Sequence, residues 1–220
     1  MKHSDDYHDY VFKNGRMVGN FDEMYRYSKD IPWHQDETTH QVFSDIDIAI
    51  LRQYTYESIC DIGCGLGYFS NRLLKELKAK KGAPKVTGFD ISGTAIKKAS
   101  RLFPEIRFVT GDLLRGHPLP REQFDLVVAK ELFWYVCHRL PLVLKRVIAL
   151  VKDNGFLYVS LCFPESDTWV GQHIIDCPET LKTILCQYTA VVHYCVEYDE
   201  HYNGRPLVHY LGRVIRDENK

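Results

Sequence analysis

Residues 58–70 read Ser-Ile-Cys-Asp-Ile-Gly-Cys-Gly-Leu-Gly-Tyr-Phe-Ser, and this stretch decides the fold. A short apolar run leads to an acid, glycines follow at positions 63, 65 and 67, and a helical pattern begins at once. This order is typical of a strand that enters a tight turn and then a helix. The glycines let a ligand lie against the main chain, and the helix offers it unpaired N–H groups and a positive dipole end. The stretch therefore predicts a site for a nucleotide-like cofactor.

The spacing of the glycines indicates which cofactor. The dinucleotide fingerprint G-x-G-x-x-G would place its third glycine where this chain has Tyr68. The chain instead reads D-x-G-x-G-x-G from Asp61 to Gly67. That pattern resembles motif I of the class I S-adenosylmethionine (SAM) methyltransferases. The resemblance implies that the turn holds the methionine part of SAM.

Two more acids follow expected strands. Residues 85–90 read as a second strand that ends at Asp90. A carboxylate at this point can accept both ribose hydroxyls of an adenosine cofactor; an ordinary turn acid is the alternative. A third strand is followed by Asp112 and Leu113. In the family that the chain resembles, an acid here receives the adenine amino group and the next backbone N–H meets a ring nitrogen.

Residues 124–129, Phe-Asp-Leu-Val-Val-Ala, read as a central parallel strand, because they are apolar almost throughout. They resemble motif IV of the same family, which leads into Lys130 and Glu131 beside the methyl group. Together the four motifs keep the family's order over residues 58–161. The resemblance thus predicts an α/β, Rossmann-like doubly wound fold with a mostly parallel seven-stranded sheet, closed by a C-terminal antiparallel hairpin.

Residues 1–56 are expected to form an N-terminal helical lid segment with no core of its own, and residues 57–220 a single compact SAM-binding methyltransferase domain. Tyr27 and Trp33 would line the cofactor site from the lid; alternatively, they pack the N-terminal arm on the sheet. The expected cofactor-binding residues are Asp61, Gly63, Cys64, Gly65, Gly67, Tyr68, Asp90, Ile91, Asp112, Leu113, Lys130, Tyr27 and Trp33.

Composition limits the partners. A net charge of −1 and the lack of a long Lys/Arg cluster argue against nucleic acid. No apolar run is long enough to span a bilayer, and no signal peptide opens the chain. The seven cysteines include no C-x-x-C pair, so we expect reduced thiols in a cytoplasmic protein and no metal site. The expected assembly is a monomer or a homodimer.

The acceptor is harder to read from the sequence. Residues 162–180 are polar and irregular, and they contain Trp169 and His173 at the place where this fold carries a substrate cover. The candidate catalytic residues are Glu131 for positioning, His173 for an acid–base role, because its charge changes near neutral pH, and Tyr135. An enclosed small-molecule acceptor is expected between the N-terminal segment and residues 169–173.

A finer resemblance concerns the acceptor. The I-P-W-H-Q-D segment at residues 31–36, the L-F-W-Y stretch at 132–135 and the W-V-G-Q-H loop at 169–173 are similar to the nodulation-factor N-methyltransferases. The similarity implies methyl transfer to an amine, such as the amino group of an amino sugar. The family's basic residues in the N-terminal helix are replaced by Thr38, Thr39, His40 and Gln41. The alternatives are an O-methyltransferase acting on a small hydroxyl or carboxyl substrate and a non-catalytic SAM-binding domain.

Overall fold

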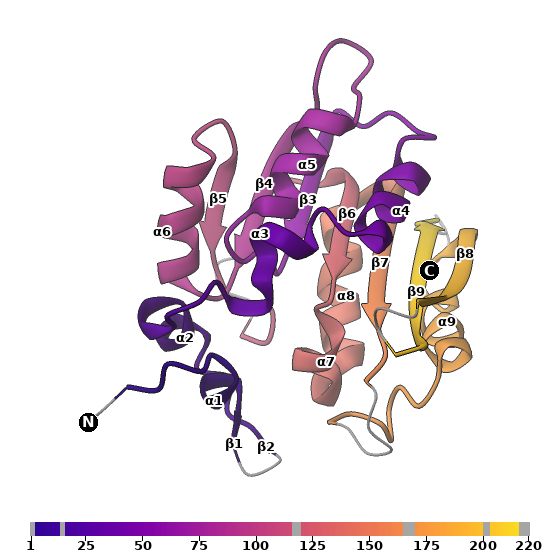
Figure 1. The fold of residues 1–220 in the computed structure, drawn as a ribbon. Coiled ribbons are helices and arrows are strands. Elements are labelled where there is room, and N and C mark those ends of the chain that lie inside the picture. Colours follow the sequence, from indigo (N-terminus) through magenta and orange to yellow (C-terminus); the bar gives the residue numbers. More distant parts are fainter. Residues whose placement is uncertain (1–2, 14–15, 116–119, 165–169, 200–202, 216–220) are drawn as a thin grey trace.

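The computed structural model describes residues 3–13, 16–115, 120–164, 170–199 and 203–215 (Figure 1). Within these ranges, no helix is both long enough and apolar enough to cross a membrane.

The strands form a two-stranded and a seven-stranded sheet. Their bounds are β1 Phe12–Lys13, β2 Arg16–Met17, β3 Ser58–Ile62, β4 Lys85–Asp90, β5 Arg107–Thr110, β6 Phe124–Lys130, β7 Val151–Cys162, β8 Ala190–Asp199 and β9 Arg205–Arg213. The α-helices are α1 His8–Val11, α2 Phe21–Tyr27, α3 Gln35–Thr38, α4 Val42–Leu51, α5 Tyr68–Glu76, α6 Gly93–Leu102, α7 Phe133–Val136, α8 Leu140–Leu150 and α9 Pro178–Cys186. Two short 3-10 helices are η1 Pro32–His34 and η2 Cys137–Arg139.

The large sheet has the strand order β5-β4-β3-β6-β7-β9-β8. All pairs from β5 to β7 are parallel, whereas β9 runs antiparallel to both β7 and β8. This topology confirms the predicted fold class, including the C-terminal hairpin. The strand order reverses between β3 and β6, and open α/β sheets bind ligands beyond the carboxyl ends of their strands at such a point.

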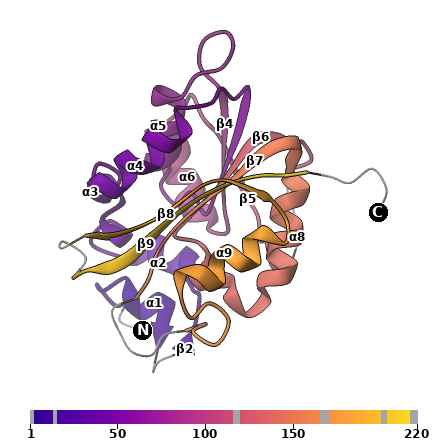
Figure 2. The same cartoon turned by 90° about the vertical axis from the view of Figure 1, so that its right-hand side faces the viewer.

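Helices cover both faces of the sheet (Figure 2). On one face, α4 and α5 pack Leu51 and Leu73 against strand residues such as Tyr158. On the other, α8 and α9 bury Val143 and Leu181. Strand β6 lies between these layers and is buried along nearly its whole length, which explains why its sequence is a continuous apolar run rather than an alternating one.

The segment before α4 packs at the carboxyl ends of the parallel strands (Figure 1). Its buried apolar residues pack into a cluster that is shared with the sheet domain. Buried Met24 and Tyr25 of α2 form an apolar cluster with Leu66 and Ala95 of the sheet domain. Helix α4 instead shares the core of α5 and the sheet, and the division of the chain at residue 56 stays a prediction.

Asp22 ties α2 to the sheet domain. Its Oδ1 accepts the Thr94 N–H at 2.8 Å and the Ser92 hydroxyl at 3.1 Å, while its Oδ2 accepts an N–H of Arg26 at 2.9 Å. The carboxylate therefore sits at the N-terminus of α6, where its charge meets the positive end of the helix dipole. The N-terminal segment is thus held to the strand that ends at Asp90.

Replacing Asp22 by alanine should loosen this attachment. Loss of a helix-capping side chain typically costs about 1 kcal/mol, so we expect amide protons of residues 21–27 to exchange roughly fivefold faster in native-state hydrogen exchange. Asp30→Ala, which removes an exposed carboxylate of the same segment, is the matched control. Equal protection in the two variants would show that Asp22 does not hold α2.

Candidate active site

The glycine turn between β3 and α5 has a left-handed backbone. Gly63, Gly65 and Gly67 have φ angles of +75°, +54° and +82°, which side chains with a Cβ rarely adopt. A Cβ at Gly65 would lie 2.5 Å from the amide atoms of Gln35 and 2.6 Å from the Tyr25 Oη. Side chains of the N-terminal segment therefore lie directly against the main chain at Gly65, and we call this close contact the Gly65 cradle.

The residues around these glycines hold the turn in place. Asp61 is 2% exposed and accepts the Ser70 hydroxyl at 2.5 Å; burial raises the pKa of Asp61 to about 6. Cys64 is buried, and burial raises the pKa of its thiol. Tyr68, at the start of α5, packs edge-on against Phe103 with ring centroids 5.4 Å apart. Among the contacts that the structure describes, the hydrogen bond from Ser70 to Asp61 thus links α5 to β3 across the turn.

Asp90 lies where the sequence predicts it, at the end of β4 beside the turn. Its Oδ2 accepts the Gly65 N–H at 2.9 Å, and its Oδ1 accepts the Ser92 N–H at 2.8 Å. Burial raises the pKa of Asp90, although these N–H groups oppose the shift. The next residue, Ile91, is 46% exposed and borders a cavity of about 310 Å³ that is also lined by Phe21 and Asp22.

Asp112 and Leu113 occupy the turn after β5. The Asp112 carboxylate accepts the N–H of Leu114 at 2.7 Å and that of Arg115 at 3.3 Å, so it closes its own turn in the manner of an Asx-turn. The Leu113 carbonyl accepts a hydrogen bond from Arg146 of α8, and its side chain is buried. The adenine contacts expected for this pair stay a prediction.

In the N-terminal segment, Gln35 and Tyr25 lie against the glycine turn, while the cofactor contacts expected of Tyr27 and Trp33 stay a prediction. Tyr27 stacks on His3, with ring centroids 3.5 Å apart, whereas Gln35 accepts the Leu66 N–H at 2.9 Å and donates to the Tyr25 hydroxyl at 2.8 Å. Gln35 and Tyr25 are therefore the lid residues that touch the glycine turn. Helical spacing places Tyr25 on one stripe of α2 with residues 21 and 24, and Tyr27 packs against the same apolar cluster from a partly buried position.

Trp33 lies in an aromatic cluster between the N-terminal segment and α7. Its ring centroid is 5.7 Å from those of Tyr7 and Tyr135 and 6.4 Å from that of Phe21. Phe21 and Tyr135 are 5.4 Å apart in an edge-to-face arrangement. Trp33 has a φ of +55°, a strained conformation of the kind that gathers at functional sites. The cluster joins the lid to the end of β6.

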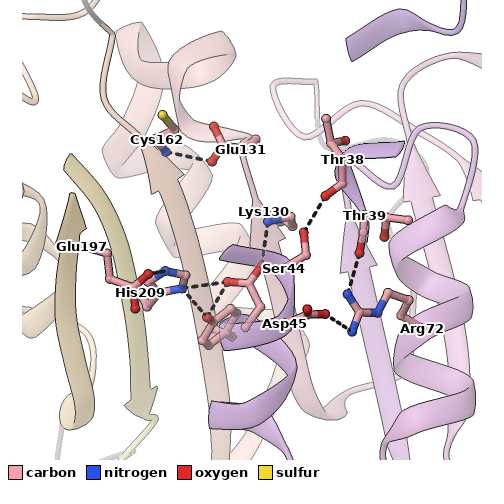
Figure 3. A network of polar contacts seen from close by, with 12 residues as sticks. Thr38, Thr39, Ser44, Asp45, Arg72, Lys130, Glu131, Cys162, Glu197 and His209 are labelled. Atoms are coloured by element: carbon pink, nitrogen blue, oxygen red, sulfur yellow. Dashed lines mark hydrogen bonds and ion pairs between the residues drawn. The ribbon is translucent and has the colours of Figure 1, made fainter. Parts of the chain in front are cut away.

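The end of β6 carries two ionisable side chains with different surroundings (Figure 3). Lys130 reaches toward α4, where its Nζ lies 2.6 Å from Asp47 Oδ2. Glu131 has a φ of +53°, and its Oε1 accepts the Cys162 N–H at 2.7 Å. Burial raises the pKa of Glu131 to about 7, against the opposing effects of Lys130 and the Cys162 N–H. Burial also raises the pKa of Tyr135, and the charge of Glu131 adds to the shift.

The second predicted acid–base residue is separate from this group. His173 lies in the turn before α9 with an exposed side chain, and no contact among the described residues joins it to Glu131. Trp169 falls outside the described residues. The structure thus brings Glu131, Tyr135 and Trp33 together and leaves His173 apart. Likewise within the described part of the chain, no three His, Cys, Asp or Glu side chains are grouped to hold a metal ion.

These residues fit the expected cofactor. The main chain at Gly65 lies against Gln35 and Tyr25 of the lid, the Asp90 carboxylate stands at the end of β4, and Ile91 presents an apolar surface to the neighbouring cavity. Gly65, Asp90 and Ile91 are accordingly the residues that we expect to hold SAM. Its site borders Gln35 and Tyr25 of the lid.

Gly65→Ala should weaken binding of S-adenosylhomocysteine (SAH), the product form of SAM, at least tenfold by isothermal titration, because the new Cβ displaces Gln35 and fills the cradle. The control is Gly82→Ala, where φ is also positive (+79°) but nothing lies within 4 Å of the added atom. Both variants should lose about 1–2 kcal/mol of stability through the left-handed backbone. Equal SAH affinity in the two would contradict the cradle.

Comparison with known proteins agrees with this geometry. Residues 59–155 match the family described as "Methyltransferase domain", and no curated protein matches the sequence significantly.

Three solved structures share the fold. N-methyltransferase NodS from Bradyrhizobium japonicum WM9, in complex with SAH, is 18% identical, with 90% of this chain and 100% of NodS covered and a TM-score of 0.69. A SAM-dependent methyltransferase from Methanosarcina mazei is 18% identical, with coverages of 77% and 97% and a TM-score of 0.59. Magnesium protoporphyrin IX methyltransferase (ChlM) from Synechocystis PCC 6803, with bound SAM, is 17% identical, with coverages of 94% and 89% and a TM-score of 0.56.

At these identities the three structures establish the fold, and the family match over residues 59–155 adds the activity. With the glycine turn, the strand-end acids and the strand order in place, residues 59–155 form a methyltransferase domain, and the chain has the fold of the class I SAM-dependent methyltransferases.

Proposed function

We propose that the protein methylates an amino group of a small molecule, with Glu131 as the residue that receives the proton. The observation that carries the proposal is the position of Glu131 at the end of β6, with a strained φ of +53° and a carboxyl pKa of about 7. Perturbed carboxyls and strained backbones gather at catalytic sites. Support for an amine also comes from NodS, which is an N-methyltransferase.

The carboxyl of Glu131 suits an amine better than an alcohol. An amine must be neutral when it attacks, so a base has only to remove the proton of an ammonium group, whose pKa is about 10 in water and falls when the group is desolvated. An alcohol is a far weaker acid and would need a stronger base than a carboxylate. A base with a pKa near 7 is well matched to proton transfer at neutral pH.

The aromatic cluster provides the second support. Trp33, Tyr135 and Phe21 present ring surfaces within one cluster, and a cation is attracted to such faces. The acceptor is charged before it loses its proton, and methyl transfer from the sulfonium makes the product nitrogen positively charged again. The rings also exclude water, which favours alignment of the acceptor nitrogen.

Bound SAM supplies an electrophilic methyl group together with its own leaving group. The chain itself has three tasks. The lid segment, held by Asp22 and Gln35, would exclude water; the aromatic cluster would orient the amine; and the Glu131 carboxylate would accept the ammonium proton. We propose the lid role for residues 1–41 and leave α4 with the sheet. A cytoplasmic location and a monomeric or homodimeric state belong to the same proposal.

Tritiated methyl transfer from SAM onto a panel of amino sugars, polyamines and hydroxylated metabolites tests the acceptor class. We expect label on free amines and none on the same compounds after N-acetylation, because an amide nitrogen is a poor nucleophile. This pairing keeps the hydroxyl groups of each amino sugar constant. Equal labelling of free and acetylated compounds would overturn the amine assignment in favour of O-methylation.

The pH dependence of kcat/KM should report Glu131. Activity should fall as the pH drops through about 7, because a protonated carboxyl can no longer accept a proton. Glu131→Gln should lower kcat by roughly 10²- to 10⁴-fold, the usual contribution of a general base, and remove this acid limb. Retention of the limb in the variant, measured on the identified amine, would assign it to another group. SAH titration on both proteins controls for an intact cofactor site.

A further inference from the structure

A network of polar side chains is buried between α4 and the sheet (Figure 3). Asp47 of α4 has no exposed surface, and its Oδ2 lies 2.6 Å from Lys130 Nζ. Its Oδ1 accepts the Tyr158 hydroxyl at 2.7 Å and lies 2.8 Å from His209 Nδ1. Burial opposes the charge of Asp47, but Lys130 and His209 outweigh it and lower the pKa of Asp47 to about 2.

Packing alone does not account for this charge. Most other buried residues of α4, such as Phe43, Ile48 and Leu51, are apolar, and the exception, Ser44, donates to the Thr38 carbonyl. An apolar residue at position 47 would extend the same face. Replacing buried ion pairs by apolar residues is often neutral or stabilising. The carboxylate at the centre of this buried helix face therefore indicates a role for Asp47 beyond attaching α4 to the sheet.

The position of Lys130, which pairs with Asp47, suggests that reason. Lys130 immediately precedes Glu131, and its positive charge acts on the Glu131 carboxyl by lowering the pKa of that group. Its Nζ lies against Asp47 and 3.6 Å from the centroid of the Phe43 ring, with a side chain only 13% exposed. Among the described residues, Glu131 forms no ion pair with a lysine, arginine or histidine. The Lys130 ammonium group is therefore paired with α4 and not with Glu131.

We propose that Asp47 is a positioning residue for methyl transfer: it binds and neutralises Lys130, and thereby leaves the Glu131 carboxyl unpaired beside the acceptor. The proposal rests on the proposed role of Glu131. It assigns to α4, which holds none of the sequence motifs of the family, a part in setting the acid–base chemistry of the strand end.

The charges around Glu131 determine whether each substitution raises or lowers the pKa of Glu131. The titratable or charged side chains that face it or its hydrogen-bond partner are Lys130 of β6, Asp47 of α4, His209 and Arg205 of β9, Cys162 of β7 and Tyr135 of α7. Asp47 raises the pKa of Glu131, whereas Lys130 and His209 lower it. Removing Asp47 alone should therefore lower the pKa of Glu131, and removing Lys130 alone should raise it.

A charge-compensation series tests this directly. The pKa of Glu131 is measured by NMR titration of protein carrying ¹³C-labelled glutamate carboxyls, with Glu131→Gln used to assign the signal. We expect Asp47→Asn to lower the pKa by about one unit and Lys130→Gln to raise it by about one unit. The double variant should return it to within a few tenths of a unit of the parent value, since both charges are then absent.

Asp45→Asn is the matched control, because Asp45 lies on the same helix but is 60% exposed and pairs with Arg72; it should leave the Glu131 pKa unchanged. On the identified amine, the acid limb of the rate profile should move down in Asp47→Asn and up in Lys130→Gln. A purely structural tie would alter thermal stability without these opposed shifts.

The outcomes separate the two proposals. An unchanged Glu131 pKa in both single variants would overturn the role of Asp47, and so would equal shifts of the same sign. If Asp47→Asn alone fails to fold, the difference in Glu131 pKa between Lys130→Gln and the double variant gives the effect of Asp47, and no difference would overturn its role. The opposed pKa shifts in a protein that methylates no amine would overturn the proposed function and still support the coupling of Asp47 to Glu131.

Discussion

The structure depends on one close approach, that of other chain segments to the backbone of the glycine turn. On one side, Gln35 and Tyr25 lie where a Cβ of Gly65 would be. On the other, the Phe108 ring of β5 would be 2.6 Å from a Cβ at Gly67 and 2.5 Å from one at Gly88. Only glycine leaves room for contact from both sides, so the turn fixes the distance between the lid, β4 and β5.

Buried charge is the second feature that shapes the site. Asp47, Asp61 and Asp90 are each at most 7% exposed, and each finds donors: a lysine and a histidine, a serine hydroxyl, and two backbone N–H groups. Satisfied in this way, buried polar groups make the local structure unique rather than merely stable. The cost of desolvation stays visible in the raised pKa of Asp61, which lacks a cationic hydrogen-bond partner.

The carboxylates at the ends of β4 and β6 have different surroundings. Asp90 is buried, and its two oxygens accept the N–H groups of Gly65 and Ser92. Glu131 has a left-handed backbone, and among the described residues it accepts a hydrogen bond from the Cys162 N–H. Both carboxylates end parallel strands of one sheet, and such differences in surroundings allow two carboxylates to take different roles.

The sequence by itself determined the order of strands and helices, the glycine turn and the acids at strand ends. These follow from local rules: apolar runs form buried strands, glycine permits positive φ, and consecutive parallel strands place their ends on one edge of the sheet. The contacts of Tyr25 and Gln35 with the glycine turn do not follow from these rules, because they depend on how the N-terminal segment packs against the sheet domain.

Only the tertiary structure decided the rest. The partners of Lys130 are Asp47, 83 residues earlier in the chain, and the rings of Phe43 and Phe69. Asp22 meets Thr94 across 72 residues. Such contacts leave no periodic trace in the sequence, because they arise where separate elements pack and a buried charge must find whichever donor the fold brings near. The identity of a strand-end residue is therefore local information, whereas its protonation and its partner are properties of the assembled fold.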